Sequence, residues 1–239
     1  MVRLLLRFPS DPHFRNARPD SPEARPKVKD VVRVRTQRTA AVGVAEHGNS
    51  AVLVTVASGG ELLDRRRIDL THGLPTHPYH HEGAWAVGRY LNSPWARPMQ
   101  LPAAVALIRR VHESAARGAR DSLEALAATV PAPIANIAIR ECPALPPTIE
   151  ERIADNRAQV VADSVMYRDA LAVEARARGW SVFWYQRSRV FRDAAAALGG
   201  ADINALLQSM GRSIGPPWQA THKLAAAAAL AAAGPAAPL

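Results

Sequence analysis

The amino-acid sequence predicts an α/β fold with a mixed five-stranded sheet that carries helices on both faces. Three short apolar, β-branched segments follow one another with tight turns between them, which indicates an antiparallel meander. Two further strand-like segments come later, each after a long segment whose apolar residues have helical spacing. A strand that is reached through a helix joins its neighbour in parallel. The order therefore predicts three antiparallel strands followed by two parallel ones.

The first three predicted strands cover residues 39–45, 50–57 and 61–70. The turn signals between them are EHGN at 46–49 and SGG at 58–60. Gly and Asn favour tight turns, because both residues tolerate the backbone conformations that turns need. The third segment carries enough polar residues to be solvated on one side, as the outer strand of an antiparallel sheet can be.

A loop rich in His and Pro is expected over residues 71–81, and helices then alternate with strands. The nearly continuous apolar run around Ile137 predicts a strand that is covered on both faces. Thr148 and Glu151 form the signature of a capping box, and Gly179 is suited to end the same helix. The elements expected after the loop are a helix at 82–92, a long helix from about 102 to 129, a strand at 132–141, a helix at 148–178, a strand at 180–185, and helices at 188–198, 202–210 and 218–233.

Charge is unevenly distributed along the chain. The net charge is +9, and residues 1–38 carry ten of the 30 basic residues but four of the 21 acidic ones. This segment is rich in Pro and has no sustained apolar period, so we expect it to be disordered, with a single domain over residues 39–239. It could be an arm that is attracted to phosphate or a leader without a structural role. Charged residues of the 148–178 helix are expected on a solvated face: Asp155, Arg157, Asp163 and Arg168.

Cysteine content and hydropathy favour a cytoplasmic protein without a membrane partner. The single cysteine, Cys142, excludes an internal disulfide. The longest apolar run, residues 224–233, is about half the length that crosses a bilayer.

The predicted order of elements over about residues 39–233 resembles the ribonuclease H-like superfamily, which includes ribonucleases H, Holliday-junction resolvases, transposases and integrases. Actin-like and sugar-kinase folds share this core order. Those folds would need phosphate-binding glycine loops, which the sequence does not contain.

The resemblance implies a phosphodiesterase site with two divalent cations, Mg²⁺ or Mn²⁺, about 4 Å apart between carboxylates. Glu46 follows the first strand and Glu141 the fourth, at the places of two superfamily ligands. Glu82 begins the first helix, and His222 lies near the start of the last helix. The sequence departs from the superfamily in two ways: the first acid is Glu instead of Asp, and no acid follows Asp202.

Each of these residues also has a structural interpretation. Glu46 and Glu141 could be solvated strand ends, Glu82 could stabilise a helix N-terminus, and His222 could be a packed or capping side chain. Trp218 precedes His222 by one helical turn, so it would share that face as a site wall or as ordinary packing.

The loop contains a second group of candidate residues, which are His72, His77, His80 and His81. Imidazoles bind zinc, but this spacing matches no standard zinc signature. His81 could instead be a proton shuttle at the mouth of the site, because histidine titrates near neutral pH. A polar surface loop is the third interpretation.

The sequence thus supports two main hypotheses. The first is a divalent-metal-dependent nuclease or resolvase-like phosphodiesterase that acts on nucleic acid. The second is a non-catalytic ribonuclease H-like module that binds nucleic acid or a protein partner, which the missing final acid favours. A zinc hydrolase built on the histidine loop is a more distant third.

Overall fold

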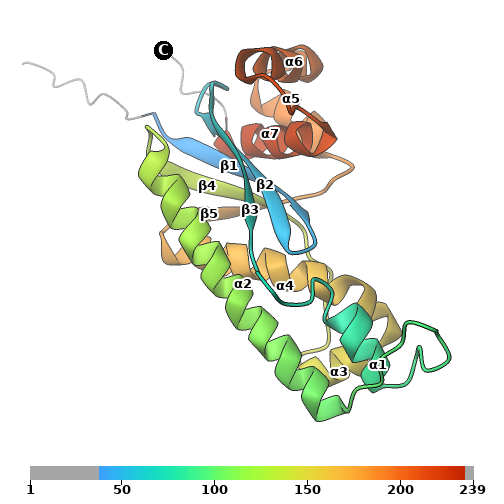
Figure 1. Cartoon of the computed structure of the whole chain (residues 1–239). Coiled ribbons are helices and arrows are strands. Elements are labelled where there is room, and N and C mark those ends of the chain that lie inside the picture. The colour runs from blue at the N-terminus through green and yellow to red at the C-terminus, as the bar shows by residue number, and fades with distance from the viewer. Residues whose placement is uncertain (1–37, 235–239) are drawn as a thin grey trace, which may run out of the picture. The chain divides into compact units, whose positions relative to one another are not determined.

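Five strands form one mixed sheet in the order β3-β2-β1-β4-β5 in the computed structural model, which describes residues 38–234 (Figure 1). β1 and β2 are antiparallel, as are β2 and β3, whereas β1, β4 and β5 are mutually parallel. This confirms the predicted class, an α/β fold with a mixed five-stranded sheet of three antiparallel and two parallel strands. The predicted basic segment, residues 1–38, lies outside the described residues except for Arg38. The strands are β1 Ala40–His47, β2 Ser50–Ala57, β3 Leu62–Asp69, β4 Ile134–Arg140 and β5 Ser181–Tyr185.

Helices cover both faces of this sheet (Figure 1). One face packs against the long helices α2 and α4, and the other packs against α5, α6 and α7. The helical elements are the π-helix η1 Tyr79–Gly83, α1 Ala84–Ala86, α2 Leu101–Thr129, α3 Ile149–Ala154, α4 Asn156–Ala177, α5 Val190–Ala197, α6 Ile203–Ile214 and α7 Ala220–Ala233.

The side chains of β1 alternate between the two faces of the sheet, and the core is divided into two layers accordingly. Val42 and Val44 pack in the layer under α2 and α4, while Ala45 packs in the layer under α7. Successive side chains of a strand point to opposite faces, so an uninterrupted run of small apolar residues fills both layers.

α7 lies very close to β1 at Gly43. A Cβ atom on Gly43 would fall 1.8 Å from the carbonyl oxygen of Ala225 and 2.6 Å from the amide nitrogen of Ala229. The five alanines from Ala225 to Ala229 are all fully buried. The alanine-rich sequence of α7 therefore lets its backbone approach the sheet more closely than larger side chains would allow.

Three predicted helices have clearly different bounds in the structure, and one of them, expected at 202–210, continues to Ile214 as α6. The helix expected at 148–178 begins with the predicted capping box between Thr148 and Glu151, but it breaks at Asp155, whose ψ of 117° is not helical. Asp155 then caps α4 by accepting hydrogen bonds from the backbone amides of Arg157 and Ala158. The helix expected at 82–92 instead starts at Tyr79 as a π-helix, and its regular part ends at Ala86.

No helix within residues 38–234 combines the length and the apolar character that crossing a membrane requires.

Candidate functional site

The carboxyl ends of β1, β4 and β5 lie at one edge of the sheet, because these strands are parallel. Glu46 is the next-to-last residue of β1, and Glu141 directly follows β4. Gly43 pairs with Ala138, and continuing this register sets Glu46 at the level of Glu141. The structure thus places the first two predicted site residues on neighbouring strands at the edge where ligands bind in many α/β folds.

A guanidinium group occupies the space between these two strand ends. Arg168, from α4, donates from Nε to Oε1 of Glu46 at 2.8 Å, and its Nη2 donates to the same oxygen. Its Nη1 donates to the main-chain carbonyl of Glu141 at 2.9 Å. The side chains of Arg168 and Glu46 are each 6% exposed, whereas Glu141 is exposed. The carboxylate of Glu46 is therefore already paired with a buried cation of the protein.

The other two predicted site residues lie on opposite faces of the sheet. Glu82 is buried in η1, which packs against α4, and burial raises the pKa of its carboxyl group. His222 is buried in the first turn of α7, where its Nδ1 accepts a hydrogen bond from the backbone amide of Gln219 at 3.1 Å. Burial, and then the charge of Arg65, lower the pKa of His222. Trp218 packs beside His222 with ring centroids 5.9 Å apart.

The predicted set of Glu46, Glu141, Glu82 and His222 therefore does not converge in this structure. In the part of the chain from 38 to 234, no group of three or more His, Cys, Asp or Glu side chains is placed to hold a metal ion. The donor set does not fit a pair of divalent cations, because one carboxylate is paired with Arg168 and the other two candidate ligands lie on opposite faces of the sheet.

The histidine loop packs beside the same edge of the sheet. A Cβ on Gly48, in the turn after β1, would meet the side chain of Thr76 at 2.7 Å and that of His77 at 3.6 Å. His81 stacks on Trp85 with ring centroids 6.1 Å apart and an interplanar angle of 13°. Burial and the neighbouring histidines lower the pKa of His77.

Asp163 anchors this loop to α4. Its two carboxylate oxygens accept hydrogen bonds from the backbone amides of Tyr79 at 2.9 Å and of His80 at 3.2 Å. Burial raises the pKa of Asp163 to about 7, partly offset by those two hydrogen bonds, and the charge of Glu82 raises it further. His77 Nδ1 lies 3.9 Å from the same carboxylate.

The sequence-based placement of Asp163 and Arg168 on a solvated face was wrong. These side chains are buried, with residue exposures of 4% and 5%. The helical spacing of apolar residues indicated this burial. Asp163 lies three and four residues before the buried Met166 and Tyr167. Arg168 lies three and four residues before the buried Leu171 and Ala172. Arg168 is the residue of this candidate site that the sequence did not indicate.

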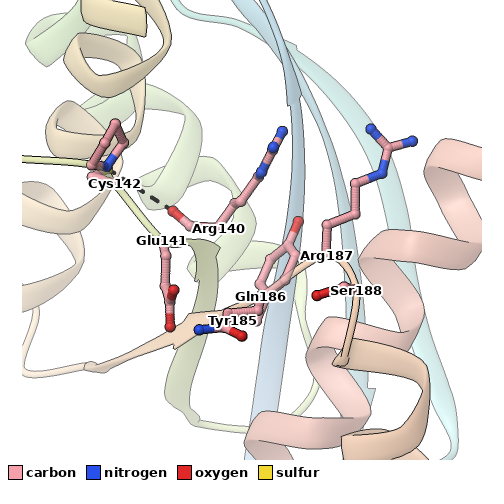
Figure 2. A pocket seen from close by; sticks show the side chains of 8 residues that line it. Arg140, Glu141, Cys142, Tyr185, Gln186, Arg187 and Ser188 are labelled. Atoms are coloured by element: carbon pink, nitrogen blue, oxygen red, sulfur yellow. Dashed lines mark hydrogen bonds between the residues drawn. The ribbon is translucent and has the colours of Figure 1, made fainter.

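An open cavity of about 690 Å³ adjoins the ends of β4 and β5. In Figure 2 the side chains of Arg140 and Arg187 rise on one side of it, while Glu141 points the other way. Burial raises the pKa of the Cys142 thiol, which disfavours its nucleophilic thiolate form. The cavity is lined by Arg140, Glu141, Cys142, Pro143, Tyr185, Gln186, Arg187 and Ser188.

Comparison with known proteins finds similarity among solved structures alone. No protein-family model and no curated protein matches the chain. The T. thermophilus RuvC in complex with a Holliday junction substrate is 14% identical, with 81% of this chain and 91% of that chain covered and a TM-score of 0.43. A second Thermus thermophilus RuvC structure is also 14% identical, with 81% and 92% covered and a TM-score of 0.42. Both likenesses concern the fold alone.

Proposed function

We propose that this chain is a ribonuclease H-like module that binds the phosphate backbone of nucleic acid at the carboxyl edge of its sheet and does not cleave it. The observation that carries the proposal is the buried pair between Arg168 and Glu46. Arg168 supplies positive charge between the strand ends, which is where the superfamily resemblance implies divalent cations.

Hydrogen bonds and an ion pair with Glu46 hold Arg168 between the ends of β1 and β4. All three nitrogen atoms of its guanidinium group donate hydrogen bonds to Glu46 or to the carbonyl of Glu141. Removing one partner of a buried ion pair costs about 3–5 kcal/mol, because the other charge is left buried and unpaired. A divalent cation that replaced Arg168 at Oε1 of Glu46 would leave the guanidinium buried without this partner, at a cost on that scale.

Positive charge around the cavity suits an anionic polymer. Arg187 is exposed and Arg140 is half-buried, and both line the cavity beside the polar side chains of Gln186 and Ser188. Arginine recognises phosphate through paired N–H donors, and most protein–nucleic acid hydrogen bonds go to phosphate and sugar. Glu141 is the one acid that lines the cavity, so the lining carries a net positive charge.

The binding experiment compares the wild-type chain with an Arg140→Gln, Arg187→Gln variant on labelled branched DNA, single-stranded DNA and RNA–DNA hybrid in EDTA. We expect binding without metal. The slope of log K against log salt concentration is negative, and we expect its magnitude to be smaller by about 2 in the variant, since each phosphate contact contributes about 0.9. Arg110→Gln, which removes an exposed arginine of α2, is the matched control and should leave the slope unchanged. Equal slopes for all three proteins would contradict the proposed surface.

A divalent-metal-dependent nuclease or resolvase-like phosphodiesterase is the second candidate. It is favoured by the position of Glu46 and Glu141 at one level of neighbouring strands. It would require Arg168 to release Glu46, and it would use Mg²⁺ or Mn²⁺ with Glu82 and His222 as further ligands. Cleavage of DNA or RNA that depends on both the metal and Glu46 would establish this candidate in place of the first.

A further inference from the structure

Aromatic side chains gather in the segment between β3 and α2. The ring of Trp95 lies within 4.9 Å of Tyr90, 6.2 Å of His81 and 6.3 Å of Trp85, measured between ring centroids. We call Trp95 and these three neighbours the ring cluster. Trp95 is 52% exposed, so much of its surface is open to a partner.

Apolar exposure is concentrated in the segment that carries the ring cluster. The large hydrophobic residues that are exposed in residues 38–234 number eight, and four of them lie between 87 and 101. These four are Val87, Leu91, Trp95 and Leu101. Clustered apolar exposure of this kind marks an interaction site more often than scattered single residues do.

The charge of residues 72–101 favours an anionic partner. Between residues 72 and 101 the cationic side chains are Arg89 and Arg97, and the single acid, Glu82, is buried. Arg97 is exposed, whereas the guanidinium of Arg89 donates to the buried side chain of Gln159. An anionic nucleic acid strand can therefore bring a phosphate to Arg97 and flat bases to the rings.

We propose that the ring cluster is a stacking platform for unpaired nucleobases, with Trp95 as the exposed stacking residue. The inference rests on the proposed function, because the arginines at the sheet edge hold the phosphate backbone while the ring cluster holds bases. Aromatic faces stack on any base, so the platform favours single-stranded or unpaired nucleic acid without selecting a sequence.

The test compares single-stranded DNA with an abasic strand of the same length and the same number of phosphates. We expect wild-type protein to bind the base-bearing strand about tenfold more tightly, which is the scale of one stacked base. Trp95→Leu, which keeps apolar volume but removes the ring, should lose this preference, and Trp95→Phe should retain most of it. Phe191→Ala, which removes an exposed ring of α5, is the matched control and should leave the preference unchanged.

The outcomes separate this inference from the proposed function. Equal binding of the two strands by wild-type protein overturns the platform and leaves phosphate binding intact. Binding of neither strand overturns both. A preference that survives Trp95→Leu also overturns the platform, and a change in sedimentation of that variant would then identify the patch as a contact between copies of the chain. Melting temperatures of the variants establish that each protein is folded.

Discussion

Individual residues determine what this site can do, and Arg168 is the most consequential of them. Its guanidinium pairs with Glu46 and with the carbonyl of Glu141, so one residue of α4 connects two strand ends. The positions of Glu46 and Glu141 at those strand ends could be predicted from the sequence, because strand ends follow from local patterns. The partner of Glu46 could not, because Arg168 is 122 residues away along the chain.

Arg168→Leu leaves the buried carboxylate of Glu46 without a counter-charge. We expect the free energy of unfolding to fall by about 3–5 kcal/mol, measured by urea denaturation. The double variant Glu46→Leu, Arg168→Leu removes both charges and should recover most of that loss. Equal destabilisation in the single and double variants would contradict a strong pair.

Asp163 should make stability depend on pH. Burial raises its pKa from 3.8 to about 7, so the folded state holds the proton more tightly than the unfolded state. This stabilisation is complete below about pH 4 and is lost as the pH rises through about 7. The groups that face the carboxylate are His77, Glu82 and the amides of Tyr79 and His80.

The measurement is urea denaturation of wild-type protein and of Asp163→Asn between about pH 4 and about pH 8. Subtracting the variant removes the contributions of the histidines that both proteins share. The unfolding free energy of wild type minus that of the variant should decrease by at most about 4 kcal/mol over this range. A difference that stays constant with pH would show that Asp163 does not titrate there.

At the scale of elements, local signals predicted the start of α3 but not its end. The capping box of Thr148 and Glu151 forms as expected, because all of its partners lie within one turn. The break at Asp155 interrupts a pattern that otherwise reads as one helix. Its signal was present, since Asp is a strong N-cap residue, but apolar periodicity continues across it.

The contact between α7 and β1 gives a test at this scale. Gly43→Ala would place a Cβ 1.8 Å from a backbone oxygen of α7, so the helix must move away from the sheet. We expect a loss of about 1–3 kcal/mol in unfolding free energy, or more, as for other overpacked cores. Gly83→Ala is the matched control, because its Cβ would meet a side-chain carbon of Ile153 at 3.1 Å that can shift. Similar melting temperatures for the two variants would contradict this account of α7.

At the scale of the whole described domain, the strand order could be predicted because it follows from element order and the handedness of crossovers. Whether the four candidate ligands converge could not be predicted. It depends on which face of the sheet each helix covers, and α7 carries His222 on the face opposite Glu82. Sequence placed Glu46, Glu141 and His222 near element ends correctly, but element ends of one sheet can lie on different faces.

The central claim is that Arg168 stands where a cation would be needed, so the chain binds nucleic acid without cleaving it. The most direct measurement incubates wild-type protein and a Glu46→Gln, Glu141→Gln variant with branched DNA, single strands and RNA–DNA hybrid in Mg²⁺ or Mn²⁺, and resolves the products on a denaturing gel. We predict intact substrates in every lane and binding that persists when the metal is chelated. Metal-dependent products from the wild type that disappear in the variant would contradict the claim.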